Sequence, residues 1–157
     1  MVNATDYTIQ ILEKNKHNLK CVLALEDFCF SKDKTSQQTY TKLFNRQNTT
    51  IFGVHYKGDL IGSAITISRT GGDYRLYSLG VMPSHRDVGV GNALLDAVER
   101  WCVHQKATLL QFETRSDNMN AMIFYKQRGY RIFGTYKNFY EEGAAAVRLV
   151  KKLKAVT

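Results

Sequence analysis

The stretch that decides the fold is VMPSHRDVGVGNALLDAVERW, residues 81–101, which runs from an apolar strand end through a charged turn and two glycines into an amphipathic segment. Glycine lets a ligand approach the backbone and permits a positive φ. The free N–H groups of a helix's first turn and the positive end of its dipole form an anion site. Arg86 adds a guanidinium that can hold a phosphate through two hydrogen bonds. Gly89, Gly91 and Arg86 thus suit a pyrophosphate, although glycines in this pattern also serve a turn alone.

Two other phosphate-binding loops fit the stretch poorly. A Walker loop ends in Gly-Lys-Ser/Thr, whereas Gly91 is followed by Asn and Ala. A dinucleotide-binding fingerprint begins with a glycine at the strand end and has a third glycine three residues after the second. Here residues 83–88 intervene before Gly89, and Leu94 occupies the third position. The Walker loop is excluded, and the Rossmann fold is disfavoured.

Composition narrows the class of protein. A chain of 157 residues has room for one ordinary domain, so we expect a single domain over residues 1–157. No apolar run approaches the roughly 20 residues that span a bilayer, and the N-terminus lacks the pattern of a signal peptide. The three cysteines form no CxxC pair and the four histidines show no metal-ligand spacing. We therefore expect a cytoplasmic protein with no metal and no membrane contact.

The formal charge of +8 leaves the partner open. It would suit a polyanionic cofactor, an acidic protein or nucleic acid. The basic residues are spread along the chain and form no dense block except KKLK at residues 151–154, so most of them are expected on solvated surface.

Apolar periodicity and turn residues predict seven strands and four helices. In chain order these are a strand at 7–12, helices at 18–30 and 36–45, strands at 49–56, 60–68 and 74–81, a helix at 92–105, a strand at 108–114, a helix at 120–128, and strands at 130–136 and 146–153. Glycine turns join the three middle strands into an antiparallel meander. The expected fold class is α+β with a mixed central sheet.

Two motifs together resemble the GNAT-type N-acetyltransferases. LGVMPSHRDVGVGNALL is similar to the acetyl-CoA loop of that superfamily, whose signature is Arg/Gln-x-x-Gly-x-Gly/Ala after a strand ending Val-x-Pro. FETRSDNMNAMIFYKQRGY resembles the segment that follows it at the family's spacing, through Glu113, Arg115, Asn118, Ala121, Tyr125, Gly129 and Tyr130. The two matches cover about residues 76–133. The nearest branch is that of the ribosomal-protein N-terminal acetyltransferases.

The resemblance implies a three-layer fold and acetyl-CoA as cosubstrate. A mostly antiparallel sheet of about seven strands would be flanked by about four helices, with a bulge and a V-shaped slot between two central strands. Backbone groups of Leu79 and Val81 would bind the acetyl carbonyl and the pantetheine. The pyrophosphate would be held by the loop residues Arg86, Asp87, Val88, Gly89, Val90, Gly91 and Asn92. Asp87 departs from the family, because many members have glycine there and a carboxylate repels a pyrophosphate unless it points to solvent.

Amine acetylation needs a neutral amine and a proton donor for the departing thiolate. The resemblance makes Tyr125 the general acid and lets Asn118 bind the pantetheine. It makes Glu113 the proposed base, acting directly or through water, with Tyr77 as a substrate-orienting residue. Outside this context Tyr125 would be taken for a core aromatic residue and Glu113 for a surface residue of a short strand.

The acceptor is less well defined. YKNFYEEGAAAVRLVKKL loosely resembles the Asn-Tyr-Tyr ending of the ribosomal-protein branch through Asn138, Phe139 and Tyr140. A peptide or protein amine is therefore favoured over a small amine such as a polyamine or an aminosugar. Glu141 and Glu142 could meet a cationic acceptor or simply form an exposed turn. The alternative is a non-catalytic module that binds CoA or nucleic acid, which would need neither Glu113 nor Tyr125, and no RNA-binding aromatic signature is present. We expect a monomer or homodimer.

Overall fold

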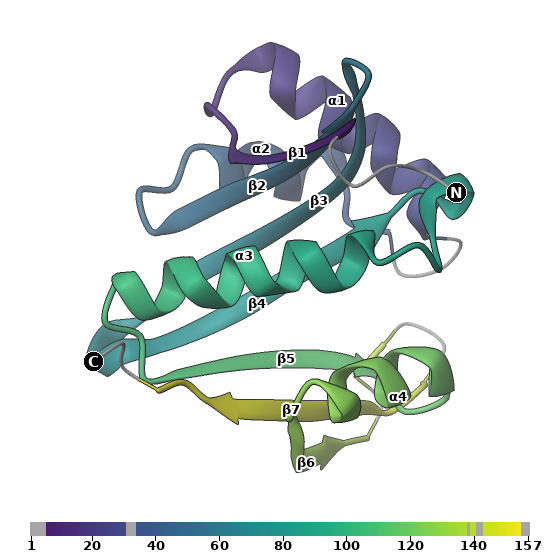
Figure 1. The fold of residues 1–157 in the computed structure, drawn as a ribbon. Helices are drawn as coiled ribbons and strands as arrows, with labels where there is room; N and C mark the ends of the chain where they lie inside the picture. Colours follow the sequence, from purple (N-terminus) through teal and green to yellow (C-terminus); the bar gives the residue numbers. More distant parts are fainter. Residues whose placement is uncertain (1–5, 31–33, 138, 141–142, 155–157) are drawn as a thin grey trace.

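One mixed sheet of seven strands separates two pairs of helices in the computed structural model, which describes residues 6–30, 34–137, 139–140 and 143–154 (Figure 1). The elements are β1 (Tyr7–Ile11), α1 (Lys16–Cys29), α2 (Gln37–Phe44), β2 (Thr49–Tyr56), β3 (Asp59–Ser68), β4 (Asp73–Val81), α3 (Val90–His104), β5 (Leu109–Arg115), α4 (Met119–Gln127), β6 (Arg131–Tyr136) and β7 (Ala146–Lys152). The predicted order of elements and the α+β class are confirmed.

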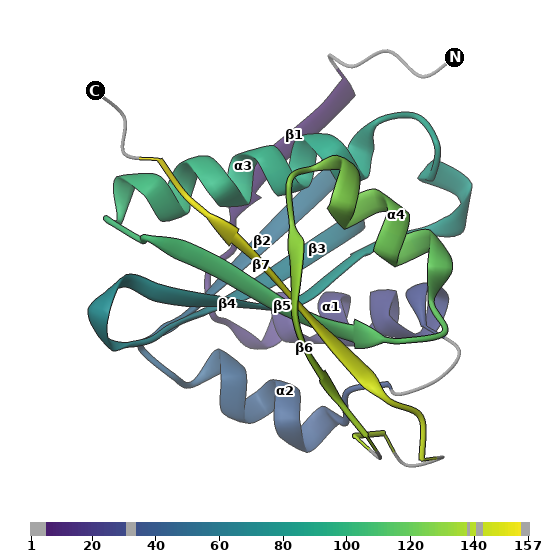
Figure 2. The same cartoon turned by 90° about the horizontal axis from the view of Figure 1, so that it is seen from below.

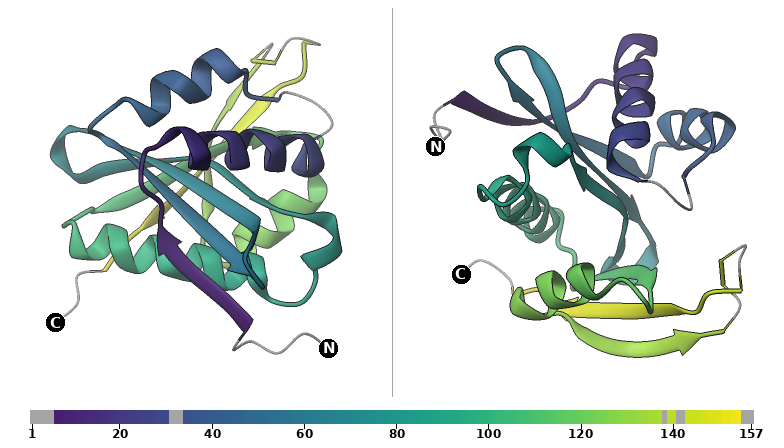
Figure 3. Two further views of the ribbon diagram at one scale, coloured as in Figure 1. Left: turned by 90° about the horizontal axis from the view of Figure 1, so that it is seen from above. Right: turned by 90° about the vertical axis from the view of Figure 1, so that its right-hand side faces the viewer.

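The two helix pairs cover opposite faces of the sheet (Figure 3). On one face, α1 and α2 pack on β2, β3 and β4 around a core that contains Val22, Tyr40, Leu43, Ile51 and Ile65. On the other face, α3 and α4 cover a core that contains Leu76, Leu94, Leu95, Val98, Leu110, Tyr125 and Leu149. The apolar periodicity of α2 and α3 supplies the stripe that each core buries, whereas α4 buries Tyr125 alone.

The sheet opens in its middle. Its strand order is β1-β2-β3-β4-β5-β7-β6, and β4 and β5 form the only parallel pair among these strands. This pair is short, because the last partners are Arg75 and Gln111, and beyond them β4 and β5 diverge (Figure 2). The expected slot between two central strands is therefore present.

A bulge lies in β4 beside the point of divergence. Ile65 of β3 pairs with Ser78, whereas the next residue, Thr66, pairs with Leu76. Tyr77 is thus the extra residue of β4. A bulge bends its strand and increases the local twist, which turns the second half of β4 away from β5.

Helix α3 begins two residues before its expected start. Gly89 is its N-cap and has a φ of +91°, a conformation that glycine adopts without steric cost. The loop glycine therefore starts the helix, and Val90 and Gly91 lie in the first turn. This places the backbone N–H groups of the loop at the mouth of the slot.

Candidate active site

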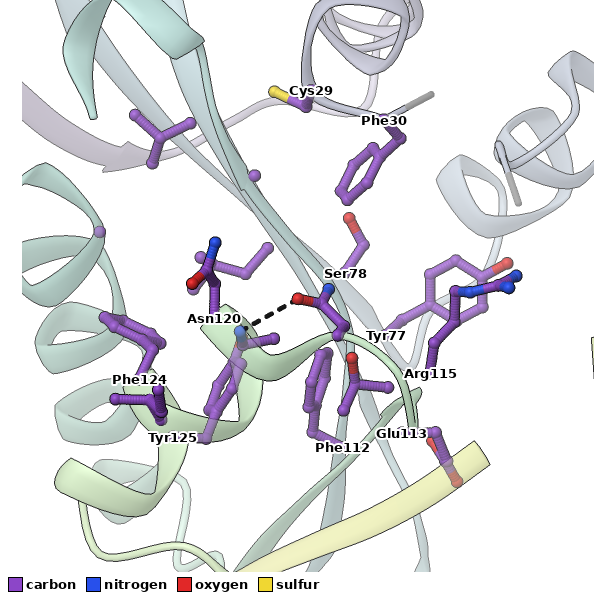
Figure 4. A pocket seen from close by; sticks show the side chains of 18 of the residues that line it. Cys29, Phe30, Tyr77, Ser78, Phe112, Glu113, Arg115, Asn120, Phe124 and Tyr125 are labelled. Carbon is purple, nitrogen blue, oxygen red and sulfur yellow. Dashed lines mark hydrogen bonds between the residues drawn. The ribbon is translucent and has the colours of Figure 1, made fainter. Parts of the chain in front are cut away.

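A cavity of about 1370 Å³ occupies the slot between β4 and β5 (Figure 4). It is lined by residues of α1, β4, the loop before α3, β5 and α4, and by Phe139 and Tyr140. The predicted site residues that line it are Tyr77, Leu79, Val81, Arg86, Asp87, Gly89, Gly91, Asn92, Glu113, Asn118 and Tyr125. The side chains of Val88 and Val90 do not, since Val88 is exposed and Val90 is buried in the core under α3.

The loop before α3 presents a row of free N–H groups. The first helical hydrogen bond of α3 runs from the Ala93 N–H to the Gly89 carbonyl. The N–H groups of residues 87–92 have no acceptor in the described part of the chain. A Cβ on Gly89 would meet no heavy atom within 4 Å, and one on Gly91 would meet only the ring of Phe124, at 3.8 Å. Such an open row at a helix N-terminus fits a pyrophosphate.

The Arg86 guanidinium makes two hydrogen bonds within the chain. Its Nε donates to the Val81 carbonyl at 2.8 Å, and its Nη2 donates to the Cys29 carbonyl at 3.2 Å. The guanidinium therefore ties the end of α1 to the end of β4. The grip of this guanidinium on the phosphates stays a prediction, and two of its nitrogens already have acceptors within the chain.

Asp87 has a left-handed backbone conformation, with a φ of +65°. Aspartate tolerates this region better than most residues, and glycine tolerates it best. The conformation explains why glycine suits this position of the loop. The Asp87 side chain is exposed, which lessens but does not remove its repulsion of a bound pyrophosphate.

The backbone of β4 faces the slot at Leu79 and Val81. The Met82 N–H donates to the Ile61 carbonyl of β3 at 2.8 Å. Because peptide groups alternate in direction along a strand, those of Val81 and Leu79 point away from β3. The Val81 carbonyl is occupied by Arg86, so its N–H is the group left to meet a ligand.

Three aromatic rings hold Tyr125 at the wall of the slot. Its ring stacks on Phe112 with 4.3 Å between centroids, and Phe124 and Tyr130 contact it edge-on at 5.0 and 5.3 Å. The hydroxyl has no hydrogen-bond partner among the described residues. Burial, and secondly the negative charge of Glu99, raise the pKa of Tyr125. The hydroxyl thus keeps its proton at neutral pH.

Asn118 is the N-cap of α4. Its Oδ1 accepts from the Ala121 N–H at 3.1 Å, which satisfies one of the free donors of the first turn. The side-chain oxygen is therefore committed to the helix. The amide Nδ2 remains as the group that a pantetheine carbonyl could meet in the cavity.

Glu113 lies between two arginines. Its Oε2 accepts from Arg75 Nε at 3.0 Å, and its Oε1 accepts from Arg148 Nε at 3.1 Å. The Nη2 of Arg148 forms an ion pair with Oε1 at 2.9 Å. The glutamate side chain is 5% exposed. Because Phe112 faces Tyr125, its neighbour Glu113 faces the opposite side of the sheet. The two residues predicted to be catalytic therefore flank the slot from its two faces (Figure 4).

A model of the acetyltransferase (GNAT) family matches residues 19–130. The chain belongs to this family. YdhI, an uncharacterised protein of Bacillus subtilis, is 35% identical over 89 residues, which cover 57% of this chain and 54% of that protein. The uncharacterised N-acetyltransferase MJ1530 of Methanocaldococcus jannaschii is 32% identical over 82 residues, 52% of this chain and 53% of that protein. The matched region spans about half the length of these two relatives.

Solved structures have the same fold. The ribosomal-protein-S18-alanine N-acetyltransferase of Escherichia coli superposes with a TM-score of 0.85 at 20% identity, over 96% of both chains. Ard1 of Thermoplasma volcanium superposes with a TM-score of 0.84 at 21% identity, over 95% of this chain and 99% of that chain. The GNAT fold is thus present over nearly the whole chain. The family match implies transfer of an acetyl group from acetyl-CoA.

Two residues of the predicted acceptor segment, Phe139 and Tyr140, line the cavity. Tyr77 also lines it and packs on the core under α1 and α2. The guanidinium carbon of Arg115 lies 5.4 Å from the centroid of the Tyr140 ring. The other residues of the predicted acceptor segment, 138, 141 and 142, lie outside the described residues.

Sequence reasoning missed Arg75 and Arg148. Arg75 lies two residues before Tyr77, so strand alternation already put it on the same face. No local signal marks Arg148, because its contact with Glu113 depends on the register of β5 against β7. Among the described residues, no group of three metal-ligating side chains could hold a metal ion. None of the described helices is long and apolar enough to cross a membrane.

Proposed function

We propose that the protein acetylates a primary amine of a peptide or protein, with Tyr125 as the proton donor. The observation that carries this is the single cavity that joins the free N–H groups before α3 to the Tyr125 hydroxyl. The N–H row suits the pyrophosphate of acetyl-CoA, and the free N–H groups of β4 suit its amide and acetyl carbonyls. The hydroxyl then lies farther along the same slot.

Tyr125 supplies the proton that the leaving group needs. The lone pair of the amine attacks the thioester carbonyl carbon, and the C–S bond breaks with its electron pair going to sulfur. Tyr125 gives its proton to that sulfur and regains one from solvent. Its raised pKa ensures that the proton is present when the bond breaks.

Direct transfer is favoured over an acetyl-cysteine intermediate. Cys29 lines the cavity, but burial raises the pKa of its thiol to about 11, with the charge of Arg86 opposing the shift. The thiolate is the nucleophilic form of cysteine, and little of it exists at neutral pH. The described cysteines are all free thiols, which suits the cytoplasm expected from the sequence.

Glu113 has a supporting role in this proposal. Each of its oxygens accepts a hydrogen bond from a guanidinium, and protonation would weaken both ion pairs. Glu113 therefore positions Arg75 and Arg148, and water takes the proton of the amine. Proton transfer to Glu113, directly or through water, is the prediction from the sequence, and the pH profile of Glu113→Gln decides between the two.

A peptide or protein amine is favoured for two reasons. Phe139 and Tyr140 line the acceptor end, where they provide aromatic surface for an extended chain. The fold also resembles that of an enzyme named for acetylating an alanine of ribosomal protein S18. A small amine is the second candidate.

The test is a screen with acetyl-CoA and a panel of peptides, polyamines and aminosugars, with free thiol as the readout. We expect thiol release with at least one peptide amine and an acetylated product by mass spectrometry. Binding of acetyl-CoA without thiol release from any amine would favour the non-catalytic CoA-binding module.

A further inference from the structure

Five side chains form a row across four strands on the sheet face opposite α3 and α4. We define the arginine row as these five residues: Tyr77 and Arg75 of β4, Glu113 of β5, Arg148 of β7 and Tyr136 of β6. The Arg75 guanidinium carbon lies 5.5 Å from the Tyr77 ring centroid, and that of Arg148 lies 4.7 Å from the Tyr136 centroid. Glu113 joins the two guanidiniums. On this face, α1 and α2 pack on β2, β3 and β4, while β5, β7 and β6 lie beyond them (Figure 3).

The row carries one more positive than negative charge. Glu113 is the only described carboxylate paired with either Arg75 or Arg148. Of the guanidinium nitrogens of Arg75 and Arg148, only the Nε atoms donate a hydrogen bond to a described residue, and Nη2 of Arg148 forms an ion pair with Glu113. The two arginine side chains are only 25% and 26% exposed. A partly desolvated cation without a full counter-charge is costly, and its free N–H groups suit a carboxylate.

The row lies where an acceptor would approach the slot. Arg75 is the last residue of β4 that pairs with β5. Glu113 lies two residues after the last residue of β5 that pairs with β4. Both line the cavity. Tyr125 faces the slot from the other side, so an amine that reaches the thioester opposite Tyr125 comes from the side of the row.

The spacing along β4 indicates how far a carboxylate of the acceptor, bound at Arg75, would lie from the reacting amine of the same acceptor. Leu79, whose N–H is proposed to bind the acetyl carbonyl, is four residues from Arg75, which is roughly 13 Å of extended strand. The amino and carboxyl groups of a single α-amino acid are much closer than this. An extended peptide covers that distance in about three to four residues.

We propose that the arginine row selects peptide acceptors that carry an acidic side chain at the second to fourth position. The inference rests on the proposed acetylation of peptide amines and names the class of peptide. Cationic acceptors such as polyamines are disfavoured, because they would approach two guanidiniums that share one carboxylate.

The test compares two C-terminally amidated peptides, Ala-Glu-Glu-Gly and Ala-Gln-Gln-Gly, with spermidine as the cationic amine. At low ionic strength the acidic peptide should have the higher kcat/KM by about tenfold, within the range of charge-assisted hydrogen bonds. The preference should shrink as salt is added, because ions screen the partly exposed charges. Spermidine should be the poorest of the three.

Two variants locate the preference. Arg148→Gln leaves one guanidinium for one carboxylate, so the ratio of the two kcat/KM values should fall to near one. Arg75→Gln makes the same change from the other side of Glu113, so the test does not depend on one variant folding. Arg100→Gln removes the same charge from an exposed position of α3, outside the cavity, and should keep the wild-type ratio.

The possible failures are distinguishable. Turnover of the neutral peptide with a ratio at or below one overturns the selection by the arginine row but leaves peptide acetylation standing. A ratio that survives in both Arg148→Gln and Arg75→Gln also overturns it. Binding of acetyl-CoA without thiol release from any amine overturns the proposed function, and this inference with it.

Discussion

The ring of Phe112 stacks on the ring of Tyr125, with 4.3 Å between the centroids and 28° between the planes. This contact ties α4 to β5 at one wall of the slot. Because adjacent residues of a strand face opposite sides, it also fixes Glu113 on the opposite face of the sheet from Tyr125. The proposed proton donor and the ion-paired carboxylate thus lie on different sides of the slot, an arrangement that would suit attack on a bound thioester from one side and protonation from the other.

Removal of the Tyr125 hydroxyl should stop the chemistry and spare the fold. Tyr125→Phe keeps the three ring contacts and deletes an oxygen that has no described partner. We expect kcat to fall by roughly 10²–10⁴-fold, the range for general acid catalysis. Affinity for acetyl-CoA, measured by calorimetry, should change little.

Tyr74→Phe is the matched control, because Tyr74 packs on Trp101 and does not line the cavity. Its kcat should equal that of the wild type. Because the pKa of Tyr125 is raised, the wild-type rate should also show no alkaline loss that begins below pH 10, where an ordinary tyrosine ionises. If the kcat of Tyr125→Phe stayed within about threefold of the wild-type value, the loss would be far smaller than general acid catalysis provides. Water would then be the proton donor.

A methyl group on Gly91 should reduce acetyl-CoA binding without harm to stability. Gly91 does not have a positive φ, and its Cβ would lie 3.8 Å from Phe124, an ordinary contact. Gly91→Ala should therefore stabilise α3 by up to about 1 kcal/mol through helix propensity. The methyl would hold the pyrophosphate away from the N–H row, at a cost of about 1.5–3 kcal/mol for a lost charge-assisted hydrogen bond. Calorimetric titration measures the affinity for acetyl-CoA, and thermal unfolding measures the stability. Unchanged affinity for acetyl-CoA would show that the pyrophosphate does not bind at this loop.

The Asp87 carboxylate should weaken cofactor binding. Asp87→Asn removes the charge and keeps a side chain that tolerates the φ of +65°. The variant should bind acetyl-CoA several-fold more tightly at low ionic strength, and the difference should disappear in high salt. Asp59→Asn, an equal change of charge at the exposed first residue of β3, is the control. Equal affinities of Asp87→Asn and wild type at low salt would show that this carboxylate stays in solvent, clear of the pyrophosphate.

Local sequence patterns predicted the architecture because each element carries its own signal. The glycine turns set the β2–β3–β4 meander, and the period of the apolar residues set α3. The bulge at Tyr77 and the slot came only from the family resemblance, since a register shift leaves no local mark. The row of free N–H groups followed from the glycines and the helix start, which are both local.

Side-chain partners were less predictable, because they depend on contacts between distant segments. Arg86 was predicted as a phosphate ligand, and its guanidinium also donates to the carbonyl of Cys29, 57 residues away in the chain. Nothing in the sequence indicates that Glu113 is ion-paired. The register of β5 against β7 places Arg148 beside it, where Arg148 donates a hydrogen bond to its carboxylate. Residue type alone could not reveal either contact.

The role of Glu113 is decided by the pH dependence of its variant. Glu113→Gln keeps the size of the side chain and leaves two neighbouring guanidiniums without an anion. We expect the free energy of unfolding to fall by about 1–3 kcal/mol, less than for a fully buried pair, because both arginines are partly exposed. We also expect a lower kcat/KM, since Arg75 and Arg148 would lose their positions. If water takes the amine proton, the acidic limb reflects the acceptor amine itself, and the scaled profiles of variant and wild type should superimpose. A flattened or displaced acidic limb in the variant, with acetyl-CoA affinity unchanged, would instead show that the carboxylate takes the proton and would restore Glu113 as the general base.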